Sequence, residues 1–460
     1  MKIGNITAVT VTIVSLLLGG CDAGPGRSAS ALSSSSDAAP SPEPSRPSRE
    51  ASPAPAAGKG GGNPDDINGD GFADLVFTNP YWDTPPDLAI VYGSKDGLNP
   101  RTRTVMDAAD FGFKSIIRTG TVDLDGDGFA DVVIYGFPVG GYRGTSYLVW
   151  GGPEGVDPDV RPVVVQPPVF EPDFPYWGVP GDFDGDGNGD LAMGVPKTKG
   201  TVAADLAVLY GPFTREGAAR RHTIHPGPDD GDFAGLVAGR IDGRRATGLL
   251  VHGGGDGEQS PSWLFGAGPG GLSRHSRKLH EGNASAFGDF DGDGYDDVVV
   301  ADDGSRNNEP GYDTEPPEVD GVMTVYYGGA GRAPQVFKDI GYSWELVVGD
   351  FDGDRRDDLA IELGSDRVEL LHGGAAGLRR DGKVIRRLGP AKEPGGKKSA
   401  PEQRLATPRA AADYDGDGRD ELALAWFAPV HQPAWKGSGR SQWWVTDGGR
   451  DESSFDTDGW

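Results

Sequence analysis

The acidic residues of this chain recur in a nine-residue motif that occurs seven times, about 58 residues apart. Six copies keep carboxylate or amide side chains at positions 1, 3, 5 and 9, and five of these six have Gly at position 6, where the chain can turn sharply. Hard oxygen donors at this spacing in a tight loop surround one point, and position 7 can add a backbone carbonyl. This donor set suits Ca²⁺, which accepts about six to eight oxygens in a flexible shell.

The candidate ligands stand at positions 1, 3, 5, 7 and 9 of the first, second, third, fifth, sixth and seventh copies, with position 9 as the expected bidentate end. They are Asp66, Asn68, Asp70, Phe72 and Asp74; Asp123, Asp125, Asp127, Phe129 and Asp131; Asp182, Asp184, Asp186, Asn188 and Asp190; Asp289, Asp291, Asp293, Tyr295 and Asp297; Asp350, Asp352, Asp354, Arg356 and Asp358; and Asp413, Asp415, Asp417, Arg419 and Glu421.

The EF-hand, the obvious alternative for such a loop, is excluded by the residues that follow it. An EF-hand needs a bidentate Glu at position 12 and a helix on each side. Position 12 is apolar in all six copies, and short apolar runs such as Leu75–Phe77 and Val298–Val300 follow the loops. Such runs, bounded by Gly and Pro, are typical of buried strands. We therefore expect each loop to close a β-hairpin.

The fourth copy, at 240–248, has lost most of the ligand set and keeps only Asp242. Arg244 stands at position 5, where its guanidinium could take the place of the cation and pair with Asp242. The strand-like run Leu249–Val251 still follows this copy. We expect a metal-free repeat that retains the fold.

The composition of the whole chain favours a repetitive β protein. Its 460 residues include 75 Gly and 37 Pro, and its formal net charge is −27. Much of the Gly stands at fixed places in the repeats, which indicates turn-rich β structure, and no long apolar stripe of helical period is present. No basic stripe stands out, so nucleic acid is not an expected partner. We expect a monomer.

The amino-terminal region resembles a secretory leader followed by a tether. Residues 1–20 contain one early Lys and a mostly apolar stretch, and small residues precede Cys21, the only cysteine. This pattern resembles the lipobox of bacterial lipoproteins, which implies cleavage before Cys21 and its lipidation; an ordinary leader with a chance cysteine is the alternative. Residues 21–62 are rich in Ser, Ala, Pro and Gly and predict a disordered tether. The expected location is extracytoplasmic, either anchored to the cell membrane or secreted.

Each repeat also contains a second sequence motif, which predicts further strands. Runs such as Leu88–Tyr92 and Leu206–Tyr210 end in Tyr-Gly, and many continue into a Gly-Leu or Gly-Val turn such as Gly97-Leu98. A further short strand, as in Trp344–Val348, precedes the next loop. Each period thus holds about four strands with tight turns, which is the content of a propeller blade. The sequence predicts an all-β domain over residues 63–460.

The acidic loop and the apolar strand ending in Tyr-Gly-Gly together resemble the FG-GAP repeat of integrin α-subunit propellers and its bacterial relatives, often labelled VCBS repeats. The resemblance covers about residues 63–460 and implies a seven-bladed β-propeller with five or six Ca²⁺ ions in the loops that join the first two strands of a blade. The chain departs from the pattern at 240–248, at Arg355 in place of Gly, and at Glu421. Arg355 must enter a backbone conformation that Gly adopts freely, which predicts weaker binding at the sixth site.

The way in which the ring closes is a separate question. No strand-like segment precedes Asp66, since Gly58–Asn63 is poor in apolar residues. The carboxy-terminal segment Ser453–Trp460 could supply the missing strand to the first blade, which would remove an exposed edge. We therefore predict that the two ends of the chain pair in one sheet.

The sequence contains no catalytic set that stands out from chance. The only close histidine pair, His222 and His225, lacks a third ligand at recognisable spacing and is expected in a surface loop. The more promising surface is the set of insertions between the second and third strands, which the resemblance places opposite the calcium loops. These insertions are 78–86, 137–145, 196–203, 302–320 and 427–441.

The function that the sequence favours is binding of a protein or glycan by a surface-anchored, calcium-binding propeller. Trp435, between Pro and Gly in a long insertion that also carries His431 and Lys436, is the best candidate for an exposed aromatic on the ligand face. One alternative is a calcium-dependent polysaccharide lyase or glycoside hydrolase that uses the propeller as its scaffold. Another is a structural wall protein without a discrete ligand.

Overall fold

The structure is a computed structural model of the whole chain. It describes residues 55–79, 88–141, 143–198, 200, 203–228, 233–241, 245–254, 258–306, 317–329, 331–343, 345–364, 367–429, 435 and 439–460. The predicted leader, Cys21 and most of the predicted tether therefore lie outside the described residues.

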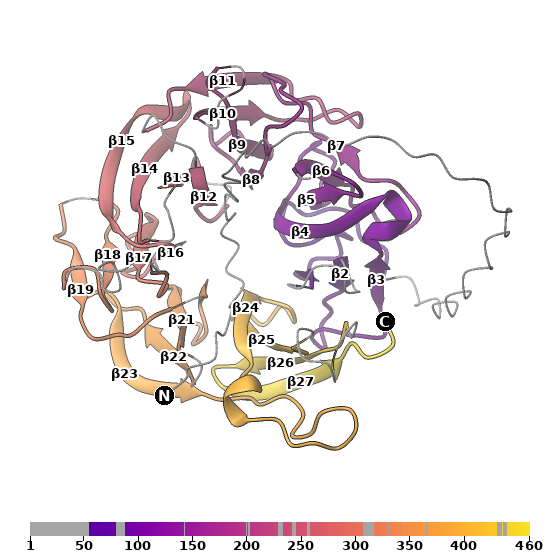
Figure 1. Cartoon of the computed structure of the whole chain (residues 1–460), viewed down its shortest axis with the longest axis vertical. Coiled ribbons are helices and arrows are strands. Elements are labelled where there is room, and N and C mark those ends of the chain that lie inside the picture. Colours follow the sequence, from indigo (N-terminus) through magenta and orange to yellow (C-terminus); the bar gives the residue numbers. More distant parts are fainter. Residues whose placement is uncertain are drawn as a thin grey trace, which may run out of the picture.

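The described residues form seven antiparallel sheets arranged in a ring (Figure 1), which confirms the predicted seven-bladed β-propeller. In chain order the strands of the blades are β1 (Leu75–Phe77), β2 (Leu88–Val91) and β3 (Arg103–Met106); β4 (Phe113–Val122), β5 (Asp131–Pro138), β6 (Thr145–Val149) and β7 (Val163–Val164); β8 (Gly178–Gly181), β9 (Asp190–Pro196), β10 (Ala204–Tyr210) and β11 (Arg221–His225); β12 (Phe233–Ala238), β13 (Leu249–Gly253), β14 (Pro261–Gly268) and β15 (Gly271–Glu281); β16 (Ala284–Gly288), β17 (Asp297–Ala301), β18 (Met323–Tyr326) and β19 (Gln335–Phe337); β20 (Leu346–Gly349), β21 (Asp358–Leu363), β22 (Arg367–His372) and β23 (Arg379–Ile385); and β24 (Thr407–Ala412), β25 (Glu421–Phe427), β26 (Ser441–Asp447) and β27 (Arg450–Asp456).

Each acidic loop joins the first and second strands of its blade, as predicted. The loop 123–131, for example, connects β4 to β5, and the two strands pair antiparallel with Val122 opposite Asp131. The first blade differs because its described sheet has three strands, β1-β2-β3, with no strand before the loop 66–74. Two short 3-10 helices, Ala108–Phe111 and Pro401–Gln403, are the only helices in the described part of the chain. None of the described helices is long and apolar enough to span a membrane.

The tyrosine of the Tyr-Gly motif joins three blades to the blade that follows them. The hydroxyl of Tyr92 accepts the backbone N–H of Val156, which lies in the Gly-Val turn of the following blade, at 3.1 Å. The same contact joins Tyr210 to Leu272 at 3.3 Å and Tyr327 to Leu378 at 3.2 Å. The Gly that follows Tyr is required because a Cβ on Gly93 would lie 2.2 Å from the carbonyl oxygen of Ala73 in the loop of its own blade.

Apolar side chains from neighbouring blades fill the space between the sheets. One cluster joins Ile90 of the first blade to Ile134 of the second, and both side chains are fully buried. Burial of large aliphatic side chains stabilises a fold by about 1.5–3 kcal/mol each, so the contacts between blades carry much of the stability of the ring.

The predicted closure of the ring by strand exchange is wrong. Ser453 and its neighbours belong to β27, which pairs with β26 as the outermost strand of the seventh blade. The two-residue turn Gly448-Gly449, with φ values of 50° and 104°, returns the chain directly beside β26 and fixes this pairing. A Gly-Gly turn between two strand-like runs is itself a hairpin signal in the sequence.

Aromatic side chains close the ring instead. The rings of Phe77 in the first blade and Trp443 in the seventh lie 4.3 Å apart, and Trp443 is fully buried. The ring of Trp460 stacks on that of Phe455 at 5.7 Å, and the guanidinium of Arg103 in β3 lies 4.4 Å from the Trp460 ring. Figure 1 shows the carboxy terminus beside β3. The carboxy-terminal residues thus meet the first blade through side chains and not through a shared sheet.

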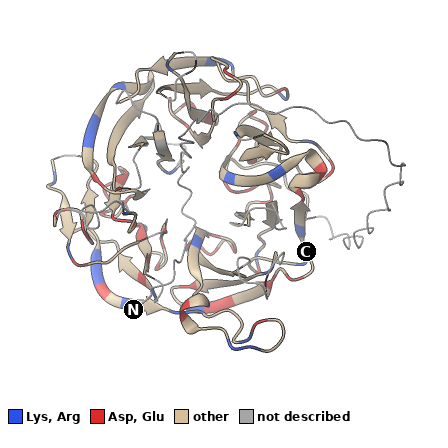
Figure 2. Ribbon diagram, viewed as in Figure 1, with Lys and Arg blue, Asp and Glu red and all other residues tan. Residues whose placement is uncertain are grey.

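The charged residues are not distributed evenly over the ring. Figure 2 shows basic segments on the outer strands β15 and β23, which contain Arg274, Arg277 and Lys278, and Arg379, Arg380 and Lys383. These strands are the outermost of their sheets and lie away from the acidic loops in the strand order. Their charges therefore compensate the acidic loops only at long range.

Candidate metal centres

The carboxylate at position 1 organises the turn of each acidic loop. In the second loop, Asp123 Oδ1 accepts the N–H groups of Gly126 and Asp127 at 2.7 and 3.2 Å, and its Oδ2 accepts the N–H of Gly128 at 2.8 Å. The third, sixth and seventh loops repeat this set. The carboxylate at position 5 accepts the N–H of position 7, as Asp127 does from Phe129 at 3.1 Å. The candidate ligands are therefore held by the backbone of their own loop.

The predicted ligands converge on one point in the second, third, fifth and seventh loops. In the seventh loop, oxygens of Asp413, Asp415, Asp417 and Glu421 lie within 4.8 Å of one another. The same spacing unites Asp123, Asp125 and Asp127; Asp182, Asp184 and Asp190; and Asp289, Asp291 and Asp297. Groups of three or four oxygen donors this close together are suited to a hard divalent cation.

The position 9 carboxylate is buried in all six loops that keep the ligand set. Asp131 is fully buried, with Oδ2 accepting the N–H of Leu124 and Oδ1 that of Gly151, both at 2.9 Å. Burial raises the pKa of Asp131 and of Asp190 to about 8, that of Glu421 to about 8 and that of Asp297 to about 7. A bound dication would favour the ionised form of these groups, because its charge offsets the loss of hydration.

One buried amide oxygen in the first loop has no hydrogen-bond partner. Asn68, at position 3, is fully buried, and its Nδ2 donates to the carbonyl oxygen of Ala56 at 2.9 Å and to Asp70 Oδ2 at 3.0 Å. These two bonds orient the amide, and its Oδ1 is left without a partner. An oxygen acceptor that is buried and unpartnered within a group of carboxylates fits a cation site.

The last residues of the predicted tether contact the first two loops. The N–H groups of Gly58 and Lys59 donate to the carbonyl oxygens of Asn68 and Gly69 at 3.1 and 2.8 Å, and Gly61 donates to Gly128 of the second loop at 3.0 Å. The segment 55–62 therefore covers part of both loops. The sequence signal for this contact is only the run of glycines that lets two backbones approach closely.

Arginine side chains lie against several of the position 3 carboxylates. Arg215 Nε is 2.6 Å from Asp125 Oδ2, and its Nη2 is 2.7 Å from Asp127 Oδ2. Arg332 Nη1 lies 2.8 Å from Asp291 Oδ2, and Arg221 pairs with Asp184. These partners, which sequence reasoning missed because they come from distant parts of a blade or from the next blade, partly neutralise three of the loops.

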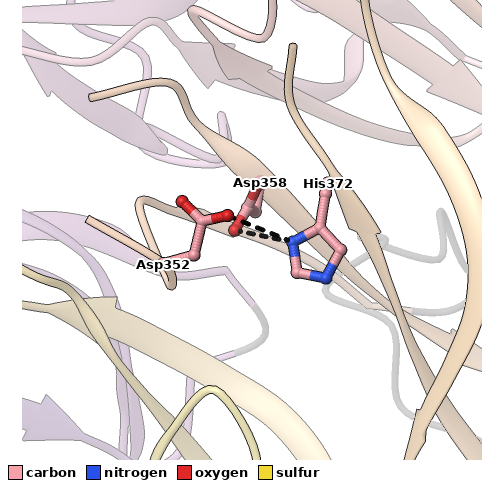
Figure 3. A group of neighbouring side chains, drawn as sticks. All are labelled: Asp352, Asp358 and His372. Atoms are coloured by element: carbon pink, nitrogen blue, oxygen red, sulfur yellow. Dashed lines mark hydrogen bonds and ion pairs between the residues drawn. The ribbon is translucent and has the colours of Figure 1, made fainter. Parts of the chain in front are cut away.

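The sixth loop differs from the others in its donors. The imidazole of His372, at the end of β22, points to the position 3 and position 9 carboxylates (Figure 3), with Nδ1 at 3.9 Å from Asp352 Oδ2 and 3.3 Å from Asp358 Oδ2. Arg355, at position 6, has a φ of 68°, which places it in the left-handed region as predicted. Its N–H still donates to Asp350 at 2.7 Å. Burial raises the pKa of Asp358 to about 6, which the nearby His372 opposes.

In the fourth copy, Asp242 and Arg244 lie outside the described residues, so their predicted ion pair stays a prediction. Arg240, at position 1, reaches two other blades instead. Its Nη1 lies 2.9 Å from Asp357 Oδ1, and its Nη2 lies 3.6 Å from Asp420 Oδ2. Both carboxylates stand at position 8 of their loops. The copy that lacks the ligand set thus contributes a cation to the sixth and seventh blades.

Backbone hydrogen bonds connect the loops around the ring. The N–H of position 8 donates to the carbonyl oxygen of position 1 in the preceding loop, as Ala130 does to Asp66 at 3.0 Å. The same bond joins the second and third loops, the third and fourth, the fifth and sixth, and the sixth and seventh, at 2.7–3.0 Å. Ala73 donates to Asp413 at 3.4 Å, which continues the series across the junction of the last and first blades. Backbone hydrogen bonds thus link these loops directly to their neighbours.

The predicted insertions lie between β1 and β2, β5 and β6, β9 and β10, β17 and β18, and β25 and β26, at strand ends opposite to those that the acidic loops join. Much of 78–86, 302–320 and 427–441 lies outside the described residues. The prediction that Trp435 is an exposed aromatic of the ligand face is wrong. Trp435 is 3% exposed and packs edge-on against Trp426 at 5.4 Å, because its side chain fills the core between the sixth and seventh blades. His431 and Lys436 lie outside the described residues. His225 is buried in β11 beside Thr223 at 3.0 Å, whereas His222 is exposed.

A partly buried ionic group lies at the ends of β20, β21 and β24 that point away from the loops. Arg409 Nη1 is 2.6 Å from Glu345 Oε1, and Glu362 is 8% exposed. Burial raises the pKa of Glu362 to about 7; Arg409 lowers it and Glu345 raises it further. This group ties the sixth blade to the seventh.

Comparisons with known proteins give only distant structural similarity. No family model matches this chain, and no curated protein matches it. The chain is similar to the solved structure of BBS1N in complex with ARL6DN, soaked with lead, at 12% sequence identity and a TM-score of 0.39, over 80% of this chain and 93% of that one. It is also similar to the V. cholerae biofilm matrix protein Bap1 at 12% identity and a TM-score of 0.21, over 86% of this chain and 79% of that one. Similarity this distant carries no argument about function, and the assignment of the propeller rests on its own seven sheets.

Proposed function

We propose that the protein is a calcium-stabilised β-propeller that presents the insertions of its opposite face to a protein or glycan ligand at the bacterial surface. The observation that carries this proposal is the repeated acidic loop. Six copies bury their position 9 carboxylate, and in the third, fifth and seventh loops two or three further carboxylates converge with it on one point. Six loops that each bury a position 9 carboxylate are more than a fold needs for tight turns, because uncompensated buried carboxylates destabilise it.

Ca²⁺ suits these sites better than Mg²⁺. In the second, third, fifth and seventh loops the protein supplies three or four converging carboxylates. Ca²⁺ accepts many protein oxygens at flexible geometry, whereas Mg²⁺ usually retains several waters and requires a near-octahedral shell. The unpartnered Oδ1 of Asn68 supports the same assignment, since amide oxygens are common Ca²⁺ ligands.

The binding role is supported by the separation of the two faces. The loops that hold the carboxylates are short and uniform, whereas the insertions on the other face vary in length. A rigid scaffold that carries variable loops on one face is a common arrangement for recognition. The base of the insertion 302–320 is itself fixed, since Arg306 pairs with Asp302 and Asp320 at 2.7 and 2.8 Å.

The test of calcium dependence uses the chain from Asp22 onward, after chelation and then with Ca²⁺ restored. Extracellular sites commonly bind Ca²⁺ with a Kd of about 0.1–1 mM. At a Kd of about 0.5 mM, 10 mM Ca²⁺ would stabilise the folded state by about 1.8 kcal/mol per site. We expect calorimetry to count five or six sites and the Tm to rise strongly with Ca²⁺ but weakly with Mg²⁺. No binding and an unchanged Tm would refute the proposal.

A matched variant assigns the effect to the loops. The double substitution Asp415→Asn and Asp417→Asn in the seventh loop should remove one site from the count and reduce the Ca²⁺-dependent rise in Tm. The control, Asp159→Asn, alters an exposed acidic residue between β6 and β7, outside the six loops, and should leave the number of Ca²⁺ sites unchanged.

The ligand-binding part of the proposal needs a separate measurement. The calcium-loaded protein is applied to arrays of bacterial surface polysaccharides and proteins, and the same mixtures are analysed for cleavage products. Retention that is lost when residues 302–320 are replaced by a short Gly-Ser linker supports a binding face. Release of shortened or unsaturated sugars would instead support the lyase or hydrolase alternative.

A further inference from the structure

The sixth loop breaks a hydrogen-bonding rule that the other five metal loops share. In those five loops, the second oxygen of the position 9 carboxylate accepts the backbone N–H of position 2, at 2.8–3.0 Å. In the sixth loop, the N–H of Phe351 donates to the carbonyl oxygen of Gly349 at 3.1 Å. Asp358 Oδ2 faces His372 Nδ1 at 3.3 Å instead. An imidazole nitrogen has therefore joined the carboxylates at this site.

His372 stands where other blades have the tyrosine of the Tyr-Gly motif. Tyr92, Tyr210 and Tyr327 occupy the equivalent place, and their hydroxyls accept backbone N–H groups of the next blade. The imidazole is 7% exposed, and its Nδ1 lies within 4.8 Å of oxygens of both Asp352 and Asp358 (Figure 3). The substitution of His for Tyr thus changes the donor set and leaves the strand in place.

A carboxylate lies on the other side of the imidazole. Asp381 Oδ2 is 3.8 Å from His372 Nε2. Histidines that bind metals usually direct their second ring nitrogen toward a carboxylate or carbonyl, which fixes the tautomer and the ring orientation. With Nε2 protonated toward Asp381, Nδ1 would present its lone pair to the site between Asp352 and Asp358.

The two remaining carboxylates of the loop have partners of their own, as their counterparts in the second and third loops do. Asp354, at position 5, pairs with Arg356 Nη1 at 2.8 Å. The oxygens of Asp350 accept N–H groups of Gly353, Asp354 and Arg355. The group of converging donors is Asp352, Asp358 and His372, whereas the seventh loop gathers four carboxylates. The sixth donor set is poorer in oxygen and contains nitrogen.

We propose that the sixth loop binds a divalent transition metal ion, with Zn²⁺ as the probe, through Asp352, Asp358 and His372, while the other loops take Ca²⁺. Imidazole suits Zn²⁺ and its first-row neighbours, whereas Ca²⁺ takes oxygen ligands almost exclusively. The inference deepens the proposed function, because it assigns a different ion to one of the six loops. It does not require that the other five bind Ca²⁺.

The test is a Zn²⁺ titration of the untagged chain from Asp22 onward, in buffer that already contains 10 mM Ca²⁺. We expect one equivalent of Zn²⁺ to bind. His372→Tyr, which restores the tyrosine of three other blades, should weaken Zn²⁺ binding at least 100-fold, and Asp381→Asn should weaken it by about 10–100-fold. His275→Tyr, at an exposed histidine of β15, is the matched control and should bind Zn²⁺ as the parent does.

Several results would overturn the assignment. These are no Zn²⁺ binding, several equivalents of similar affinity, or binding that His372→Tyr leaves unchanged. His372→Gln provides a second variant if the tyrosine does not fold, and the melt of each variant in chelator verifies its fold. A separate Ca²⁺ titration of the same samples distinguishes the two proposals. Loss of Ca²⁺ binding with retained Zn²⁺ binding refutes only the calcium proposal, and the reverse refutes only this one.

Discussion

Substitution of Arg240 tests whether its ion pairs connect the fourth blade, which lacks the acidic ligand set, to the sixth and seventh blades. Its guanidinium lies 2.9 Å from Asp357 and 3.6 Å from Asp420, whose side chains are only 9% and 10% exposed. Each carboxylate also accepts the backbone N–H of position 1 in the preceding loop. Asp357 accepts from Asp289 at 2.7 Å, and Asp420 accepts from Asp350 at 2.9 Å. Arg240→Gln would leave two mostly buried negative charges without their common counter-ion.

The size of the effect follows from these contacts. Two unit charges about 4 Å apart interact by about 4 kcal/mol at an effective dielectric constant of about 20. The Arg240 side chain is 52% exposed, so solvent screens much of this energy. Hydrogen bonds to charged groups contribute about 1.5–3 kcal/mol. We therefore expect Arg240→Gln to lower the free energy of unfolding by about 1–3 kcal/mol.

The assay is urea unfolding at pH 7.5 in saturating Ca²⁺, at low salt and again at 0.5 M NaCl. The loss should shrink at high salt, because the exposed part of the interaction is screened. In the background Asp357→Asn/Asp420→Asn, the two charges are absent, and Arg240→Gln should cost much less than in the parent. An equal loss in both backgrounds, or a change below about 0.3 kcal/mol in the parent, would refute the ionic role of Arg240.

Three further predictions concern other parts of the chain. In a double-mutant cycle of Phe77→Leu and Trp443→Leu, we expect a coupling energy of about 0.5–1.5 kcal/mol in the free energy of unfolding, because the two rings join the first and last blades. Losses of stability that simply add would contradict closure of the ring by these side chains. Glu362→Gln should raise the free energy of unfolding at pH 8 by about 1–3 kcal/mol and have little effect at pH 5. Burial raises the pKa of Glu362 from 4.5 to about 7. The stability that its neutral form contributes is therefore complete below pH 4.5 and is lost as the pH rises through 7. An equal gain in the free energy of unfolding at both pH values would contradict this role of Glu362. Cys21→Ser should move the protein from the membrane fraction to the soluble fraction of its bacterial host and remove the diacylglyceryl mass from its amino terminus, and unchanged fractionation would refute lipidation at this residue.

The features that the sequence predicted correctly are local. Position 9 of each loop and the apolar run that follows it lie in one short segment, so the spacing alone predicts the hairpin and the place of the strand. The Gly that follows Tyr92 is a local feature too. Gly93 has no Cβ, which leaves room for the carbonyl oxygen of Ala73 in the nearby loop. The seven-fold period then predicts the ring, since blades of this kind bury their faces only against one another.

The features that sequence reasoning missed depend on contacts between distant residues. Arg240 meets Asp357 and Asp420 across two and three blades, and no spacing in the chain encodes that approach. Trp435 lies in a Pro- and Gly-rich insertion, which suggested exposure, yet its ring completes the core beside Trp426. His372 replaces the Tyr of other repeats in a strand for which the sequence predicted no metal ligand. Only the folded structure shows that it lies beside Asp358.

The connections between the loops bear on how the ions would act together. The residue at position 1 has two roles, since its carboxylate organises its own turn while its carbonyl oxygen accepts the position 8 N–H of the next loop. A cation that orders Asp66 would therefore also fix Ala130, and through the second loop Asp123, which accepts from Gly189 of the third. The fourth copy interrupts the series of metal loops, and there a permanent cation, Arg240, is joined to the position 8 carboxylates of the sixth and seventh loops. Arg240 thus supplies positive charge to the ring even when the loops are empty, and binding of the ions would complete an arrangement that the fold already holds in part.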